Sequence, residues 1–173
     1  MESGENAMKA EMQPLVISAS RRTDIPACYA SWFLQRLQKR YVLVRDVHEP
    51  KRVRNIDLSP EAVSCIVFWT KNPAPLMEHL DMLRPYPYYM HYTITGYGNE
   101  VESRIPPFSE SIDRFRTLAD IIGPDRLIWR YDPIMLSPHY PALYHMELFS
   151  RIATQLEGYT RRVVISFVDF YRH

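Results

Sequence analysis

Cysteine is scarce in this sequence, which has only Cys28 and Cys65 among its 173 residues. The two lie far apart and form no C-x-x-C pair, so the chain contains no local zinc or iron–sulfur motif. Free thiols at this density are typical of a reducing compartment, and we expect a cytoplasmic protein. Long apolar runs are also missing, which excludes a membrane-spanning helix. The N-terminus lacks the apolar core of a signal peptide.

The sequence has no excess of charge of one sign, because 21 lysine and arginine residues accompany 20 aspartate and glutamate residues. A net charge of +1 argues against an extended nucleic-acid-binding surface but allows a local basic pocket. Apolar residues make up 46% of the chain and charged residues 24%, as in an ordinary globular protein. We expect a flexible tail over residues 1–13 and a single barrel-like domain over residues 14–173, incomplete at its C-terminal end.

Short apolar runs alternate with amphipathic segments along the chain. The runs predict strands at Leu15–Ile17, Tyr41–Val44, Ile66–Trp69, Tyr88–Ile94, Leu127–Trp129 and Val163–Phe167. Helical spacing predicts helices at Ala27–Lys39 (Trp32, Phe33 and Leu37 inward), Ala74–Leu83, Ser109–Ile122 and Leu143–Leu156. The charged stretch Asp46–Leu58 is expected to be an excursion, such as a short hairpin.

Strands that are apolar on both faces are typical of a parallel sheet covered by helices. The expected fold class is therefore α/β: a partial TIM-like barrel, or an open sheet, of about six parallel strands with helices outside. The chain stops directly after the last predicted strand, so we expect that strand's outer face to lack a covering helix.

Polar residues follow the predicted strands at the ends where a parallel α/β fold gathers its functional groups. From these positions we select Asp24, Lys71, Asp132 and Asp169 as candidate catalytic residues. The candidate ligand-binding residues are Ser18, Arg21, Arg22, Thr70, Asn72, Thr95, Arg130 and Ser166. The opposite strand ends, such as Arg161-Arg162, carry less varied polar chemistry.

Arginine and lysine beside carboxylates suit an anionic or zwitterionic ligand, because guanidinium groups bind carboxylate and phosphate through forked donors. The alternative is that pairs such as Arg130 with Asp132 and Arg22 with Asp24 only tie strand ends together. The histidines show no metal-ligand spacing, and we expect no metal site built from them. No P-loop, H-E-x-x-H or G-x-S-x-G pattern occurs.

Five blocks in order resemble a bacterial family called domain of unknown function 1848. They are Ser18–Pro26, Phe68–Pro73, Thr93–Gly98, Ile128–Pro133 and Ile165–Asp169. Full-length members of that family are similar to radical S-adenosylmethionine enzymes, especially the spore photoproduct lyase type. They carry a C-terminal C-x-x-x-C-x-x-C segment that implies a [4Fe–4S] cluster. This chain ends before such a segment, and its two cysteines do not match it.

Three hypotheses for function remain open. The first is most of a radical S-adenosylmethionine-like barrel enzyme, acting on an anionic or nucleotide-like substrate. The second is a cluster-free hydrolase or lyase with an aspartate base and a cationic anion clamp. The third is a non-catalytic module that binds a nucleotide or nucleic acid.

Overall fold

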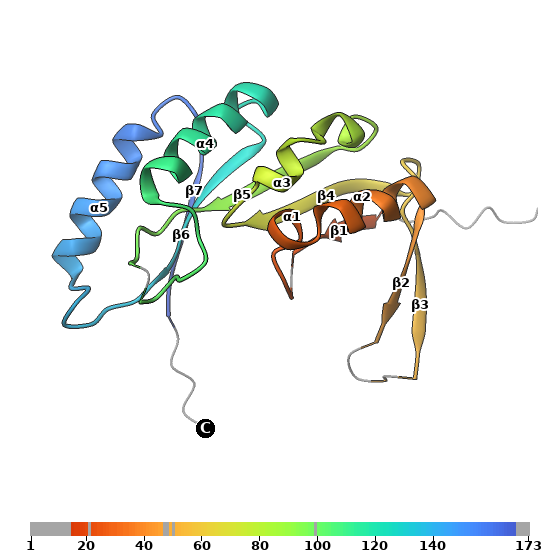
Figure 1. Cartoon of the computed structure of the whole chain (residues 1–173), viewed down its shortest axis with the longest axis horizontal. Helices are drawn as coiled ribbons and strands as arrows, with labels where there is room; N and C mark the ends of the chain where they lie inside the picture. Colours follow the sequence, from red (N-terminus) through yellow and green to blue (C-terminus); the bar gives the residue numbers. More distant parts are fainter. Residues whose placement is uncertain (1–14, 21, 47–48, 50, 99, 169–173) are drawn as a thin grey trace, which may run out of the picture.

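The computed structural model describes residues 15–20, 22–46, 49, 51–98 and 100–168. Within them, five parallel strands form one curled sheet in the order β1-β4-β5-β6-β7 (Figure 1). The strands are β1 (Leu15–Ser18), β4 (Val63–Thr70), β5 (Tyr88–Thr93), β6 (Leu127–Ile134) and β7 (Val163–Phe167). The result is a parallel half-barrel with helices outside, which confirms the predicted fold class.

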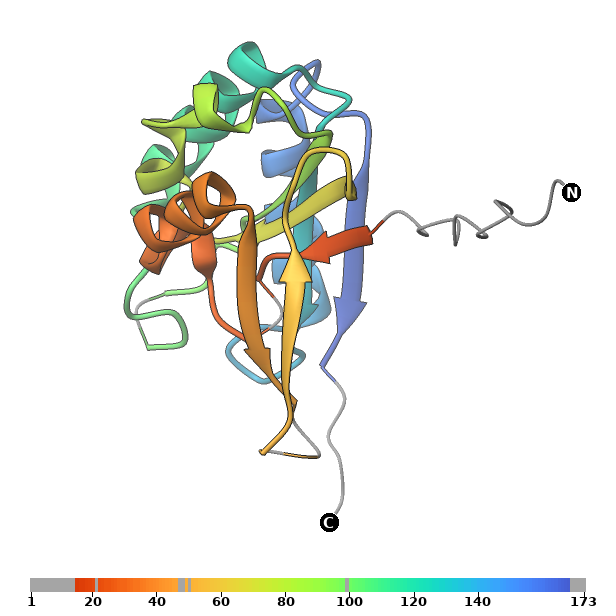
Figure 2. The ribbon, with the colours of Figure 1, turned by 90° about the vertical axis from the view of Figure 1, so that its right-hand side faces the viewer.

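The strand predicted at Tyr41–Val44 does not join this sheet. It forms β2 (Tyr41–Arg45), which pairs antiparallel with β3 (Val53–Asp57) in a separate hairpin (Figure 2). Its side chains are mostly exposed on both faces, as with Leu43 at 60% and Val44 at 45%. The parallel sheet therefore has five strands among the described residues, and the sixth predicted strand pairs with its neighbour β3 instead.

Two of the predicted helices are interrupted. The segment predicted at Ala27–Lys39 falls on two helices, α1 (Ile25–Cys28) and α2 (Ala30–Lys39). The segment Ala74–Leu83 contains α3 (Ala74–Met77) and the 3₁₀ helix η1 (Leu80–Leu83). Of the three residues predicted to face inward, Phe33 and Leu37 are buried as expected, whereas Trp32 is 45% exposed.

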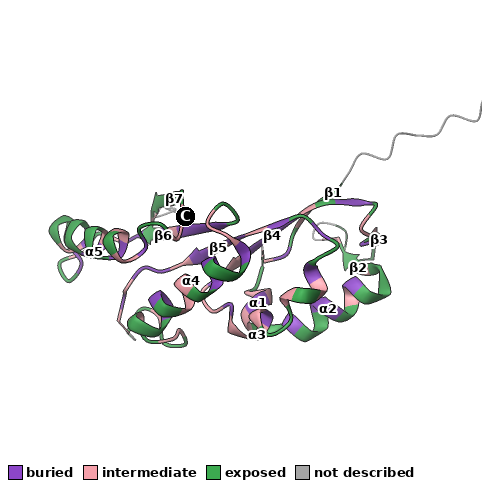
Figure 3. Ribbon diagram, turned by 90° about the horizontal axis from the view of Figure 1, so that it is seen from above, coloured by how far each residue is buried: buried purple, intermediate pink, exposed green. Residues whose placement is uncertain are grey.

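The longer helices α4 (Phe108–Ile122) and α5 (Ala142–Gln155) agree with their predicted positions to within one or two residues. Figure 3 shows α1, α2, α3 and α4 on the same side of the sheet. Side chains of the strands that point to this side form the core: Ile66, Phe68, Met90, Tyr92, Leu127, Trp129 and Tyr131, none more than 2% exposed. Because side chains along a strand alternate between its two faces, the residues between these buried ones point to the opposite face of the sheet.

The last strand lacks such a cover among the described residues. Its alternate side chains Val163, Ile165 and Phe167 are 43%, 54% and 61% exposed. Ile165 pairs with Tyr131, so the row lies on the helix side of the sheet.

The face opposite the helices, called here the inner face, carries the intervening side chains. Strand register places Trp69 beside His91 and Thr93 beside Arg130 on this face. The inner face thus combines aromatic and charged groups, whereas the helix side is apolar. Alternation along the strands therefore aims the polar chemistry of the sheet into the half-barrel.

Candidate functional site

Three of the predicted site residues come together on the inner face where β6 and β7 approach their C-terminal ends. The Arg130 guanidinium forms an ion pair with the Asp132 carboxylate, and the Ser166 hydroxyl donates a hydrogen bond to the other oxygen of that carboxylate. The Arg130 and Asp132 side chains keep 23% and 16% of their surface exposed. A small ligand in the half-barrel can therefore reach both a cation and an anion.

Aromatic rings lie next to this network. The Arg130 Cζ atom is 5.6 Å from the centre of the Trp69 ring, and the Trp69 and His91 rings meet edge-on at 5.9 Å. Within the described part of the chain, the buried Trp69 Nε1 and His91 Nδ1 have no hydrogen-bond partner. Buried polar atoms are normally paired, so these two unpaired atoms are exceptions beside the Arg130 network.

His91 is predicted to make the protein less stable as the pH falls. Burial lowers the pKa of His91 from 6.5 to about 4, helped by Arg130 and Arg162 and opposed by Asp132. The unfolded chain therefore takes up a proton below about pH 6.5 that the folded chain takes up only near pH 4. The contribution of His91 to the free energy of unfolding is therefore complete above pH 6.5 and is lost as the pH falls from 6.5 to about 4.

Urea unfolding at pH 7 and pH 5 measures the effect. The wild-type free energy of unfolding should fall between these pH values, and His91→Gln should reduce that fall. His79→Gln is the matched control, since His79 is exposed. An identical fall in wild type and His91→Gln would contradict the prediction.

A second polar group lies where β4 and β5 end. The Lys71 ammonium forms an ion pair with the Glu102 carboxylate, and the Thr95 hydroxyl donates a hydrogen bond of 2.8 Å to that same carboxylate. The Glu102 side chain is only 8% exposed. Lys71 and Thr95 also line a pocket of about 420 Å³ under the loop that follows β5.

Glycine at position 96 lets that loop turn over the pocket. Gly96 has a φ of +68°, and a Cβ atom there would lie 2.8 Å from Leu148 Cδ2. Its carbonyl accepts a hydrogen bond of 3.0 Å from the Tyr144 hydroxyl. The loop is thereby fixed to α5, which keeps Thr95 at its place in the pocket.

Asp24 uses both carboxylate oxygens inside the protein. Oδ1 accepts a hydrogen bond of 3.0 Å from the Ala27 amide and caps α1, whereas Oδ2 accepts one of 2.8 Å from the Lys71 amide. The residue connects the loop after β1 with the loop after β4. This geometry assigns Asp24 to positioning of Lys71.

Thr70 and Asn72 have a comparable local role. The Thr70 hydroxyl accepts a hydrogen bond of 2.9 Å from the Asn72 amide. Asn72 Oδ1 accepts one of 3.2 Å from the Ala74 amide and one of 2.6 Å from Arg114. These bonds shape the start of α3 and attach it to α4.

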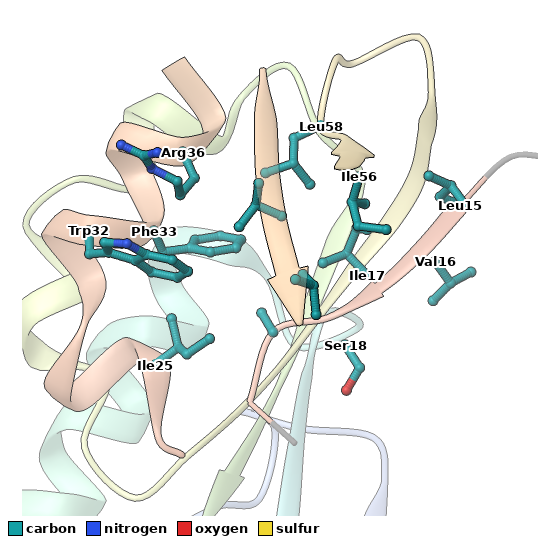
Figure 4. Close-up of a pocket in the computed structure, with 13 residues that line it drawn as sticks. Leu15, Val16, Ile17, Ser18, Ile25, Trp32, Phe33, Arg36, Ile56 and Leu58 are labelled. Atoms are coloured by element: carbon teal, nitrogen blue, oxygen red, sulfur yellow. The ribbon is translucent and has the colours of Figure 1, made fainter. Parts of the chain in front are cut away.

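The remaining predicted site residues lie neither in the Arg130–Asp132–Ser166 group nor in the Lys71–Glu102–Thr95 group. Ser18 is exposed on β1 and borders an apolar cleft of about 330 Å³, where Trp32 and Phe33 lie opposite Ile17 (Figure 4). Arg22 is exposed and has no side-chain partner among the described residues. Arg21 and Asp169 lie outside the described residues.

Sequence reasoning missed Trp69, His91 and Glu102. The first two had a signal in the sequence: because a strand alternates between its faces, Trp69 points away from Phe68 and His91 points away from Met90. Glu102 had none, because it lies in an irregular loop and meets Lys71 only through the fold.

The cysteines of this chain do not fit a [4Fe–4S] cluster. The sequence has two, of which Cys28 is exposed on α1 and Cys65 is half-buried on β4. Clusters of this type are held through more thiolates than two. Among the described residues, no three histidine, cysteine, aspartate or glutamate side chains gather as a metal site.

Comparison with known proteins gives one match. The chain matches the family described as Domain of unknown function (DUF1848) over residues 16–173. No curated protein and no solved structure matches it. In the described part of the chain, every helix is too short or too polar to cross a bilayer.

Proposed function

The chain belongs to the DUF1848 family, and on this premise we propose that it supplies the ligand-binding half-barrel of a radical S-adenosylmethionine-like enzyme. The ligand is a small zwitterionic or anionic molecule with a nucleoside-like ring. The observation that carries the proposal is the arrangement of Arg130, Asp132 and Ser166 on the inner face beside Trp69.

The chemistry of these groups matches such a ligand. Arg130 offers a guanidinium to a carboxylate or phosphate, and Asp132 offers a carboxylate to an amino group. The Trp69 ring, beside the Arg130 guanidinium, provides an aromatic surface. S-adenosylmethionine contains all three partners: a carboxylate, an ammonium group and an adenine ring.

The cluster itself is not assigned to this chain, because its cysteines do not fit one. What the chain's own residues do is bind and orient the ligand.

Titration calorimetry with S-adenosylmethionine tests the proposal. We expect the wild-type chain to bind, and Arg130→Gln to weaken binding by about tenfold or more, because a charge-assisted hydrogen bond contributes about 1.5–3 kcal/mol. Arg22→Gln is the matched control, since it removes an exposed arginine without a partner. Equal affinity of wild type and Arg130→Gln, or no binding at millimolar ligand, would contradict the proposal.

A further inference from the structure

A second cleft opens on the inner face at the opposite, N-terminal ends of β5, β6 and β7. It encloses about 810 Å³ and lies on the far side of His91 from Arg130. Residues that line it include Tyr89, His91, Ile128, Arg126, Arg161 and Arg162. The volume is in the range of pockets that hold small organic ligands.

The cleft carries an excess of positive charge. Three arginines and one aspartate, Asp125, contribute to its lining. Arg161 is paired with Asp125 at 2.7 Å, and the Arg126 Nε atom donates to the Ile122 carbonyl at 2.6 Å. Within the described residues, the Arg162 guanidinium has no hydrogen bond, ion pair or ring contact. Arg162 is therefore free to bind an anion.

The wall beside these arginines is aromatic and apolar. The Tyr89 and His91 rings meet at 5.5 Å, and the Ile128 side chain is buried next to them. The His91 Nδ1 atom is buried and has no hydrogen-bond partner among the described residues. Arg162 is among the charges that lower the pKa of His91, which places the guanidinium within electrostatic reach of the imidazole.

We propose that this cleft is a separate binding site for a phosphate ester that carries a planar ring, such as a nucleoside monophosphate. Arg162 takes the phosphate, because a guanidinium matches its oxygens with two donors. Tyr89 and His91 pack against the ring. Arg126 and Arg161 add electrostatic attraction for the phosphate but are not its principal contact.

This site does not rest on the proposed function, because its arginine lies toward the opposite ends of the strands, although His91 borders both sites. Arg130 belongs to one site and Arg162 to the other, so two variants distinguish them. Both side chains are accessible, and Arg162 is exposed without a partner, so its replacement leaves the core intact.

Titration calorimetry with adenosine monophosphate on the full chain tests the site. We expect Arg162→Gln to weaken binding by about tenfold, Arg22→Gln to leave it unchanged, and Arg130→Gln to leave it nearly unchanged. Tyr89→Leu should weaken the binding of adenosine monophosphate but not that of inorganic phosphate, because only the nucleotide has a ring.

Three results would overturn the inference. The first is equal affinity of wild type and Arg162→Gln for adenosine monophosphate, and the second is no binding of it at millimolar concentration. The third is a loss of affinity on Arg130→Gln with none on Arg162→Gln, which would indicate that the nucleotide binds in the site of the proposed function. Circular dichroism of each variant checks that the fold is retained.

Discussion

Replacing Lys71 by methionine is expected to lower the free energy of unfolding by about 2–3 kcal/mol, because it leaves the Glu102 carboxylate without its cation. The Glu102 side chain is 8% exposed and would keep only the Thr95 hydroxyl as a partner. Lys71 itself is 37% exposed, so water compensates part of the loss and the value lies below that of a fully buried pair. Chemical denaturation followed by circular dichroism measures it.

The double variant Lys71→Met/Glu102→Gln separates the ion pair from other effects of the substitution. Removing both charges leaves no buried carboxylate, so the double variant should be more stable than Lys71→Met alone. Glu102→Gln alone should have the smaller effect, because the lysine ammonium can turn to water. Strictly additive effects of the two substitutions would show that the pair does not interact.

The Asp24→Ala variant should lose about 2–3 kcal/mol of stability, since two hydrogen bonds end on this carboxylate. Loss of the helix cap at the Ala27 amide costs about 1 kcal/mol. The Lys71 amide, left without an acceptor in a half-buried position, adds about 1–2 kcal/mol. The same denaturation experiment gives the value.

Asparagine at position 24 provides the diagnostic comparison. It retains one acceptor oxygen, so Asp24→Asn should fall between wild type and Asp24→Ala. Asp113→Ala is the matched control, because Asp113 is an exposed carboxylate with one long ion pair, and its removal should change stability by less than about 0.5 kcal/mol. If Asp24→Ala were as stable as this control, the positioning role of Asp24 would be wrong.

Some of the contacts behind these predictions could be predicted from the sequence, and others could not. The ends of β4 at Thr70 and of β5 at Thr93 are visible in the sequence to within one residue, because an apolar run stops there and polar residues begin. The grouping of Arg130, Asp132 and Ser166 follows from parallel strands that end at one edge. The local hydrogen bonds of Asp24 and Asn72 change their expected role, since helix caps and turns satisfy the same polar atoms that a ligand would use.

The sequence by itself determined the alternation of strands and helices, the parallel sheet and the edge at which its polar residues gather. Periodicity carries this information, because burial of one side chain fixes the faces of its neighbours. Only the tertiary structure decided that Tyr41–Arg45 leaves the sheet, that Glu102 meets Lys71, and that the unpaired Arg162 lies at the rim of a cleft. Those outcomes depend on which distant segments pack together. The choice among distant partners produces no periodic pattern of residues that can be recognised in the sequence.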